Sequence, residues 1–117
     1  MLVTSWLAAF GFTVAIEVPI VVLATQGTPW PAWRRAVMAA FAQLATHPLV
    51  WFVFPYIPGL TGRESLWLSE VFAWIAEACL YAIAIPGVRP LRAFGVSALA
   101  NGVSLGVGLA LQAWRVL

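Results

Sequence analysis

Four long apolar runs dominate the sequence and constrain its fold more than any other feature. They are Leu2–Thr25, Ala36–Ile57, Leu66–Pro86 and Ala93–Trp114. Each run has the roughly 20 mostly apolar residues that a helix needs to cross a bilayer, and none alternates between apolar and polar residues as a half-buried strand does. We therefore predict an all-α membrane protein in which residues 1–117 form a single domain. Its four transmembrane helices are expected to pack as an antiparallel bundle of two hairpins.

Charge is scarce along the whole chain. Charged residues make up 9% of the sequence and hydrophobic residues 63%, whereas a soluble domain has about 25% charged residues. This balance excludes a water-soluble globule, a disordered chain and a nucleic-acid binder. The single cysteine, Cys79, excludes an intramolecular disulfide and a metal site built on paired cysteines. Abundant alanine and arginine without lysine is typical of a GC-rich bacterial genome, so we expect a bacterial inner membrane.

The arginines predict the orientation of the chain. The first and third connectors between the runs carry four of them: Arg34, Arg35, Arg89 and Arg92. The opposite side has Arg115 and Arg63, which neighbours the expected loop acid Glu64. Because cytoplasmic loops of membrane proteins are rich in Lys and Arg, we expect both termini to lie outside. Tryptophans in the expected outer and inner interfaces agree with this orientation: Trp6, Trp67 and Trp114 outside, Trp30 and Trp33 inside.

Several polar residues interrupt the apolar runs. They are Glu17, Gln43, His47, Glu70, Glu77 and Asn101. An ionisable group at bilayer depth is costly, so it normally faces the bundle interior and has a partner. Counting ~1.5 Å per helical residue from the cytoplasmic ends places all of them except Glu70 at a similar depth. We therefore expect a polar layer to which every helix contributes, with Glu70 nearer the outer side.

Helical spacing places these residues on inward faces. Residues three and four apart share a face of a helix, which groups Glu70, Trp74, Glu77 and Tyr81 on the third helix. The same spacing groups Gln43, His47 and Trp51 on the second helix, and Ser97, Asn101 and Ser104 on the fourth. We expect Trp51 and Trp74 to cover the layer on its outer side. The predicted ligand-binding residues are Glu17, Gln43, Trp51, Glu70, Trp74, Tyr81 and Asn101.

The chemistry of the layer favours cation handling. Glu17 and Glu77, if close together, cannot both be ionised in a low dielectric without a compensating positive charge. Glu17, His47 and Glu77 are suitable ligands for a divalent metal ion, whose identity the spacing does not specify. The same residues are suitable for a proton relay. Our first hypothesis is thus a protein that binds or translocates a divalent metal ion or a proton.

Two other functions fit the same residues. In a membrane-embedded enzyme acting on a lipid or isoprenoid, His47 and Glu77 would be the catalytic acid and base, and the aromatic residues would hold the substrate. In a small subunit or assembly factor of a membrane complex, the polar layer would serve helix association alone.

The fourth run also carries a ladder of small residues. Ala98, Gly102, Gly106 and Ala110 recur every four positions, a spacing that allows close approach of another helix. We favour packing inside the bundle for this ladder, with a homodimer contact as the alternative.

Overall fold

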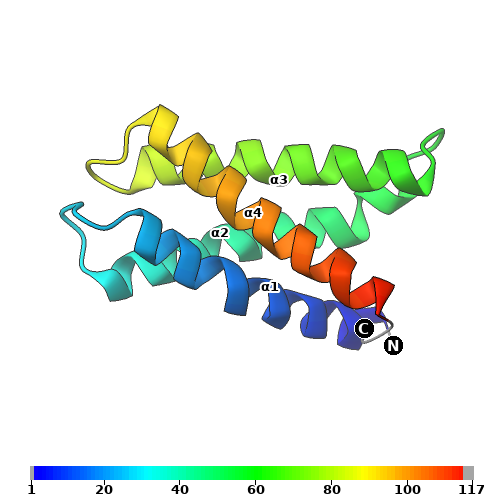
Figure 1. Ribbon diagram of the computed structural model, residues 1–117. Coiled ribbons are helices and arrows are strands. Elements are labelled where there is room, and N and C mark those ends of the chain that lie inside the picture. The colour runs from blue at the N-terminus through cyan, green and yellow to red at the C-terminus, as the bar shows by residue number, and fades with distance from the viewer. Residues whose placement is uncertain (1, 115–117) are drawn as a thin grey trace.

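The computed structural model describes the backbone of residues 2–114 and the side chains of residues 5–114. Within this range the chain forms four long helices (Figure 1). They are α1 (Leu2–Ala24), α2 (Ala32–Phe52), α3 (Gly62–Ala84) and α4 (Pro90–Ala113), with a short 3₁₀ turn, η1 (Phe54–Tyr56), after α2. Each long helix has the length and apolar composition needed to cross a membrane. The all-α prediction is therefore confirmed.

The helices form a ring in which each contacts two neighbours. The contacting pairs are α1 with α2, α2 with α3, α3 with α4, and α4 with α1. Figure 1 shows α4 crossing obliquely from α3 toward the start of α1. The start of α1, the end of α4 and the α2–α3 connector lie together at what we call the termini end. The other two connectors lie at the opposite end, the connector end.

Three of the helices begin earlier than predicted, because hydropathy falls at the arginines while the backbone remains helical. Thr61 Oγ1 accepts a hydrogen bond of 3.1 Å from the backbone N–H of Glu64, and the Glu64 carboxylate accepts one of 2.9 Å from the N–H of Thr61. This reciprocal capping box satisfies two backbone donors at the start of α3. Glu64 is thus a helix-capping residue and not a loop acid beside Arg63.

The half of the bundle nearest the connector end has a packed apolar core. The residues that lie one helical turn closer to this end than Glu17, Gln43 and Glu77 are apolar and fully buried. We call the following set the apolar core: Val21, Ala39, Ala42, Tyr81, Ile85, Val88, Ala93, Val96 and Ala100. The polar side chains of the layer are therefore separated from the connector end by closely packed apolar side chains.

Two arginines close the connector end. Arg35 is only 7% exposed, and its guanidinium donates to Val22 O, to Thr25 Oγ1 at 2.8 Å and to Trp30 O at 3.1 Å. Arg92 donates to Ala24 O at 3.0 Å. The last carbonyls of a helix lack partners within it, so both arginines satisfy the C-terminal end of α1. The sequence indicated only their role in orientation.

The ladder of small residues on α4 faces away from the other helices. Its four members are all exposed: Ala98, Gly102, Gly106 and Ala110. A Cβ atom added at Gly102 or Gly106 would meet nothing within 4 Å. The interpretation as packing inside the bundle is therefore wrong, and the homodimer contact stays a prediction.

If the ladder mediates a homodimer, Gly102→Leu and Gly106→Leu should each weaken dimerisation about tenfold or more, since a large side chain prevents close backbone approach. The dimer fraction in lipid vesicles, measured by single-molecule photobleaching at several protein-to-lipid ratios, gives the change. Gly11→Leu is the matched control, because Gly11 is exposed on α1, away from the ladder, and its added Cβ meets nothing within 4 Å. A monomeric wild type, or equal dimer fractions in all variants, contradicts the prediction.

Candidate functional site

At the centre of the bundle one amide bridges two carboxyl groups. Gln43 Nε2, from α2, donates a hydrogen bond of 2.7 Å to Glu17 Oε1 and another of 2.8 Å to Glu77 Oε1. Glu17 comes from α1 and Glu77 from α3, and all three side chains are at most 2% exposed. The two hydrogens of a single amide group thus hold two acidic side chains next to each other.

Three further side chains donate to the same carboxyl groups. Thr46 Oγ1 lies 3.0 Å from Glu77 Oε2, and Asn101 Nδ2 lies 3.1 Å from Glu77 Oε1. Ser104 Oγ donates to Glu17 Oε2 at 2.6 Å. We call these three residues, together with Glu17, Gln43 and Glu77, the carboxyl cluster. All four helices contribute to it. Glu77 accepts three hydrogen bonds and Glu17 two, so neutral groups satisfy both carboxyls.

The two hydroxyl groups of the cluster have alternative acceptors. Thr46 Oγ1 lies 3.1 Å from Ala42 O, and Ser104 Oγ lies 3.2 Å from Asn101 O. A hydroxyl group carries one hydrogen that rotates and an oxygen that accepts. Each hydroxyl can therefore donate to an ionised carboxylate, or turn its hydrogen to the backbone and accept from a protonated carboxyl.

A cavity of about 650 Å³ leads from the carboxyl cluster toward the termini end. Its lining on α1 extends from Ser5 to Glu17, and on α4 from Asn101 to Gln112. On α3 the lining includes Glu70, which is half-buried and makes no hydrogen bond or ion pair with the side chains that the structure describes. The cavity thus lies in the half of the bundle nearest the termini end, and the apolar core fills the half on the other side of the cluster.

His47 lines this cavity but does not contact the carboxyl pair. It is 9% exposed, and Nε2 lies 3.4 Å from Thr13 Oγ1. Its ring packs against Phe10 and Trp51, with centroids 5.5 and 6.4 Å away. Its Nδ1 is buried and has no hydrogen-bond partner in the described part of the chain. No three His, Cys, Asp or Glu side chains among these residues are arranged to hold a metal ion, so this geometry does not bring the proposed metal ligands together.

The structure separates the two tryptophans that were expected to cover the layer. Trp51 lines the cavity, whereas Trp74 is 36% exposed and donates to Phe94 O at 2.9 Å. The placement of Trp74 in the site is therefore wrong. Most of the buried positions of α3 recur every four residues, at Ser65, Ser69, Ala73, Glu77 and Tyr81. Trp74 follows Ala73 and lies about 100° further round the helix.

Tyr81 is fully buried, but it lies in the apolar core and not among the cavity residues. Sequence reasoning also missed Thr46 and Thr13, whose hydroxyls form hydrogen bonds with Glu77 Oε2 and with His47 Nε2. Thr46 follows Gln43 by three residues, which places it on the same helical face. Helical spacing was therefore the one feature of the sequence that could have indicated Thr46, because a threonine in an apolar run does not stand out.

A comparison of the chain with protein-family models, with curated proteins and with solved structures found no match.

Proposed function

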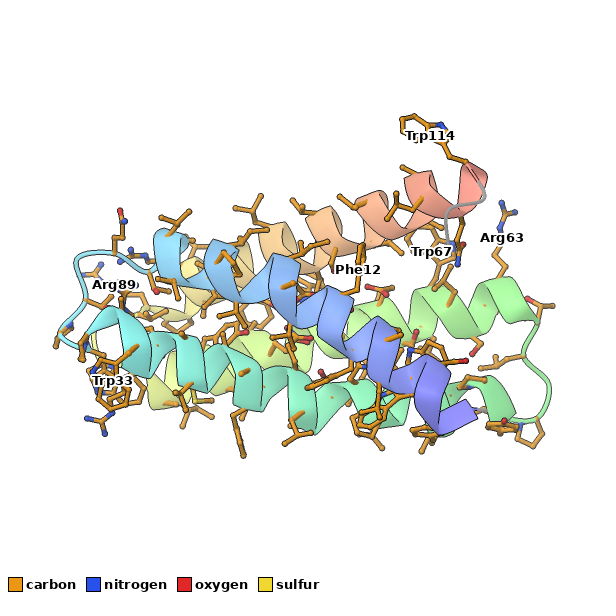
Figure 2. All side chains as sticks on the ribbon, turned by 90° about the horizontal axis from the view of Figure 1, so that it is seen from below. Phe12, Trp33, Arg63, Trp67, Arg89 and Trp114 are labelled. Atoms are coloured by element: carbon orange, nitrogen blue, oxygen red, sulfur yellow. The ribbon has the colours of Figure 1, made fainter. Side chains whose placement is uncertain are left out.

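We propose that the four helices cross a bacterial inner membrane as an antiparallel bundle of two hairpins, with both termini outside. The distribution of charge supports this orientation. Figure 2 shows Arg89 and Trp33 at the connector end, and Arg63, Trp67 and Trp114 at the termini end. With Arg34, Arg35 and Arg92, the connector end carries most of the arginines among residues 2–114, as the positive-inside rule requires of the cytoplasmic side. Arg115 lies outside the described residues.

We further propose that the protein binds protons reversibly at Glu17 and Glu77 and exchanges them with the outer side through the cavity. The observation that carries this proposal is the alternative acceptor available to each cluster hydroxyl. A proton can join Oε2 of Glu77 beside Thr46, or Oε2 of Glu17 beside Ser104, while every hydrogen bond is kept in a new direction. The cost that usually accompanies an unsatisfied buried polar group is then avoided in both protonation states.

The cluster fits a proton better than a divalent metal ion. A metal ion needs free carboxylate lone pairs directed at one point, whereas the Oε1 atoms of Glu17 and Glu77 both face the N–H groups of Gln43. His47, the third expected metal ligand, makes its hydrogen bond to Thr13 instead. A metal ion remains the alternative cation of the hypothesis, and its binding requires these side chains to rearrange.

Binding is the first step of translocation. The apolar core separates the carboxyl pair from the connector end, so passage to the cytoplasmic side requires a second arrangement of the helices in which that core opens. The same carboxyl pair then serves as the carrier site in both arrangements, as intramembrane acidic residues do in proton relays.

Infrared difference spectra recorded between high and low pH test the proposal directly. Wild-type protein in lipid should show a carboxylic C=O band that grows as the pH falls, because a carboxylate takes up a proton. Glu17→Gln combined with Glu77→Gln should remove a large part of this band, because two of the four glutamates of the sequence are then replaced. Glu64→Gln is the matched control, since it makes the same chemical change at an exposed position. Identical bands in wild type and the double variant reject the proposal.

One observation favours the enzyme as a second candidate function. His47 and Glu77 both line the same cavity, and the buried Nδ1 of His47 has no protein partner among the described residues. An apolar substrate in the cavity would lie against both groups, one as acid and the other as base. The small-subunit alternative also stands, since the cluster joins all four helices. Neither alternative depends on the two hydroxyl groups, those of Thr46 and Ser104, that can donate to either of two acceptors.

A further inference from the structure

We propose that the cavity binds an organic cation with an apolar body, which enters from the termini end and places its positive charge beside the carboxyl groups. This inference rests on the proposed function, because it assigns a substrate class to the same carboxyl pair. It goes further in that a proton or metal ion occupies only the innermost part of a cavity of about 650 Å³. Cavities of this size are typical of sites for small organic molecules.

The charge of the lining determines the sign of the ligand. Three carboxyl groups line the cavity, those of Glu17, Glu70 and Glu77, and the lining includes no arginine. An anionic ligand would be repelled by these groups. A neutral apolar ligand would displace water from Glu70, which has no hydrogen-bond partner among the described side chains, and would offer nothing in exchange. A cation compensates the acidic groups and avoids both costs.

The remaining wall of the cavity suits an apolar body. Phe12, Val50, Leu105 and Leu109 line it, together with Trp51. Aromatic faces attract organic cations through their quadrupole as well as by apolar contact. Small residues such as Ala9 and Gly108 widen the space between the larger side chains. The ligand class is therefore an amine or quaternary cation that carries aromatic or aliphatic groups.

A second observation, independent of the acidic residues, indicates a ligand. His47 is 9% exposed, lines the cavity, and has a buried Nδ1 without a partner in the described part of the chain. A buried polar atom normally has a hydrogen-bond partner. A ligand in the cavity can supply one, either through a donor group of its own or through a water that it holds.

Tetraphenylphosphonium and tetraphenylborate form a suitable pair of probes, because they share one shape and carry opposite charges. Equilibrium dialysis against protein in nanodiscs, with empty nanodiscs subtracted, measures saturable binding. We expect saturable binding of tetraphenylphosphonium and none of tetraphenylborate. Glu17→Gln combined with Glu77→Gln should weaken binding of the cation about tenfold or more. Low pH should also weaken it, since protons compete for the same carboxyl groups.

A cavity-filling variant separates this inference from the proposed function. The added Cβ at Gly108 meets nothing within 4 Å, so Gly108→Leu is expected to fold while its side chain occupies part of the cavity. It should weaken binding of tetraphenylphosphonium about tenfold, whereas the infrared carboxyl band should still grow as the pH falls, because a proton needs only the innermost part of the cavity. Gly95→Leu, the same change at an exposed position of α4, is the control and should alter neither measurement.

The outcomes are distinct. Selective binding of the cation that is lost in both the carboxyl and the Gly108 variants supports the inference. Equal binding of the two probes, or cation binding that persists in both variants, overturns it. If the infrared band behaves as expected and no saturable cation binding occurs, proton binding at Glu17 and Glu77 stands and the organic-cation inference fails. If cation binding is lost in the variants but the band is not, proton binding fails as the function of the pair.

Discussion

Replacing Glu77 with alanine is expected to destabilise the protein by about 2–4 kcal/mol. The reason is that Gln43, Thr46 and Asn101 all donate to the Glu77 carboxyl group in the bundle interior. Thr46 can turn to Ala42 O, but the Gln43 and Asn101 amides each lose an acceptor. Equilibrium unfolding in mixed micelles, followed by loss of helical circular dichroism, measures the change.

Glu77→Gln is the informative comparison, because it keeps an oxygen for Gln43 and Asn101. Its new amide group can donate to Thr46 Oγ1 once that hydroxyl turns to Ala42 O at 3.1 Å. We expect it to cost less than about 1 kcal/mol. Equal destabilisation by Ala and Gln would mean that the hydrogen-bonding scheme of the cluster is wrong. A stable Gln variant also ensures that a change in its proton binding is not a consequence of unfolding.

The sequence predicted much of this cluster because its members are costly inside a membrane. A Glu, Gln or Asn in an apolar run stands out, and helical depth and spacing then placed Glu17, Gln43, Glu77 and Asn101 near one another, as the structure has them. Threonine gives no such signal, since its hydroxyl can bond within its own helix. The sequence therefore identified the acidic groups and missed Thr46, one of the two hydroxyls that allow both protonation states.

The failures of prediction also have physical causes. Depth along a helix follows from residue number, but direction around it depends on the crossing angles with neighbours, which the sequence does not specify. Trp74 was misplaced for this reason, and the outward face of the Gly102–Gly106 ladder was misjudged in the same way. Hydropathy likewise placed the boundaries of the apolar runs at arginines. Arg35 nevertheless lies within α2, where it is buried and its long side chain reaches α1.

Arg35→Met is expected to destabilise the protein by about 3 kcal/mol, since hydrogen bonds from a charged group contribute roughly 1.5–3 kcal/mol each. Methionine keeps much of the apolar stem but leaves Val22 O and Trp30 O without their donor. Equilibrium unfolding in mixed micelles measures the loss of stability. Arg34→Met is the matched control, because Arg34 is exposed and its guanidinium carbon lies 4.3 Å from the centre of the Trp30 ring, a contact worth about 0.5–1 kcal/mol. If the Arg34 variant lost more stability than the Arg35 variant, the exposed contact of Arg34 with Trp30, and not the buried Arg35, would stabilise the connector end. The Arg35 variant should also increase amide hydrogen exchange in the last turn of α1, because Val22 O loses its donor while Ala24 O keeps Arg92.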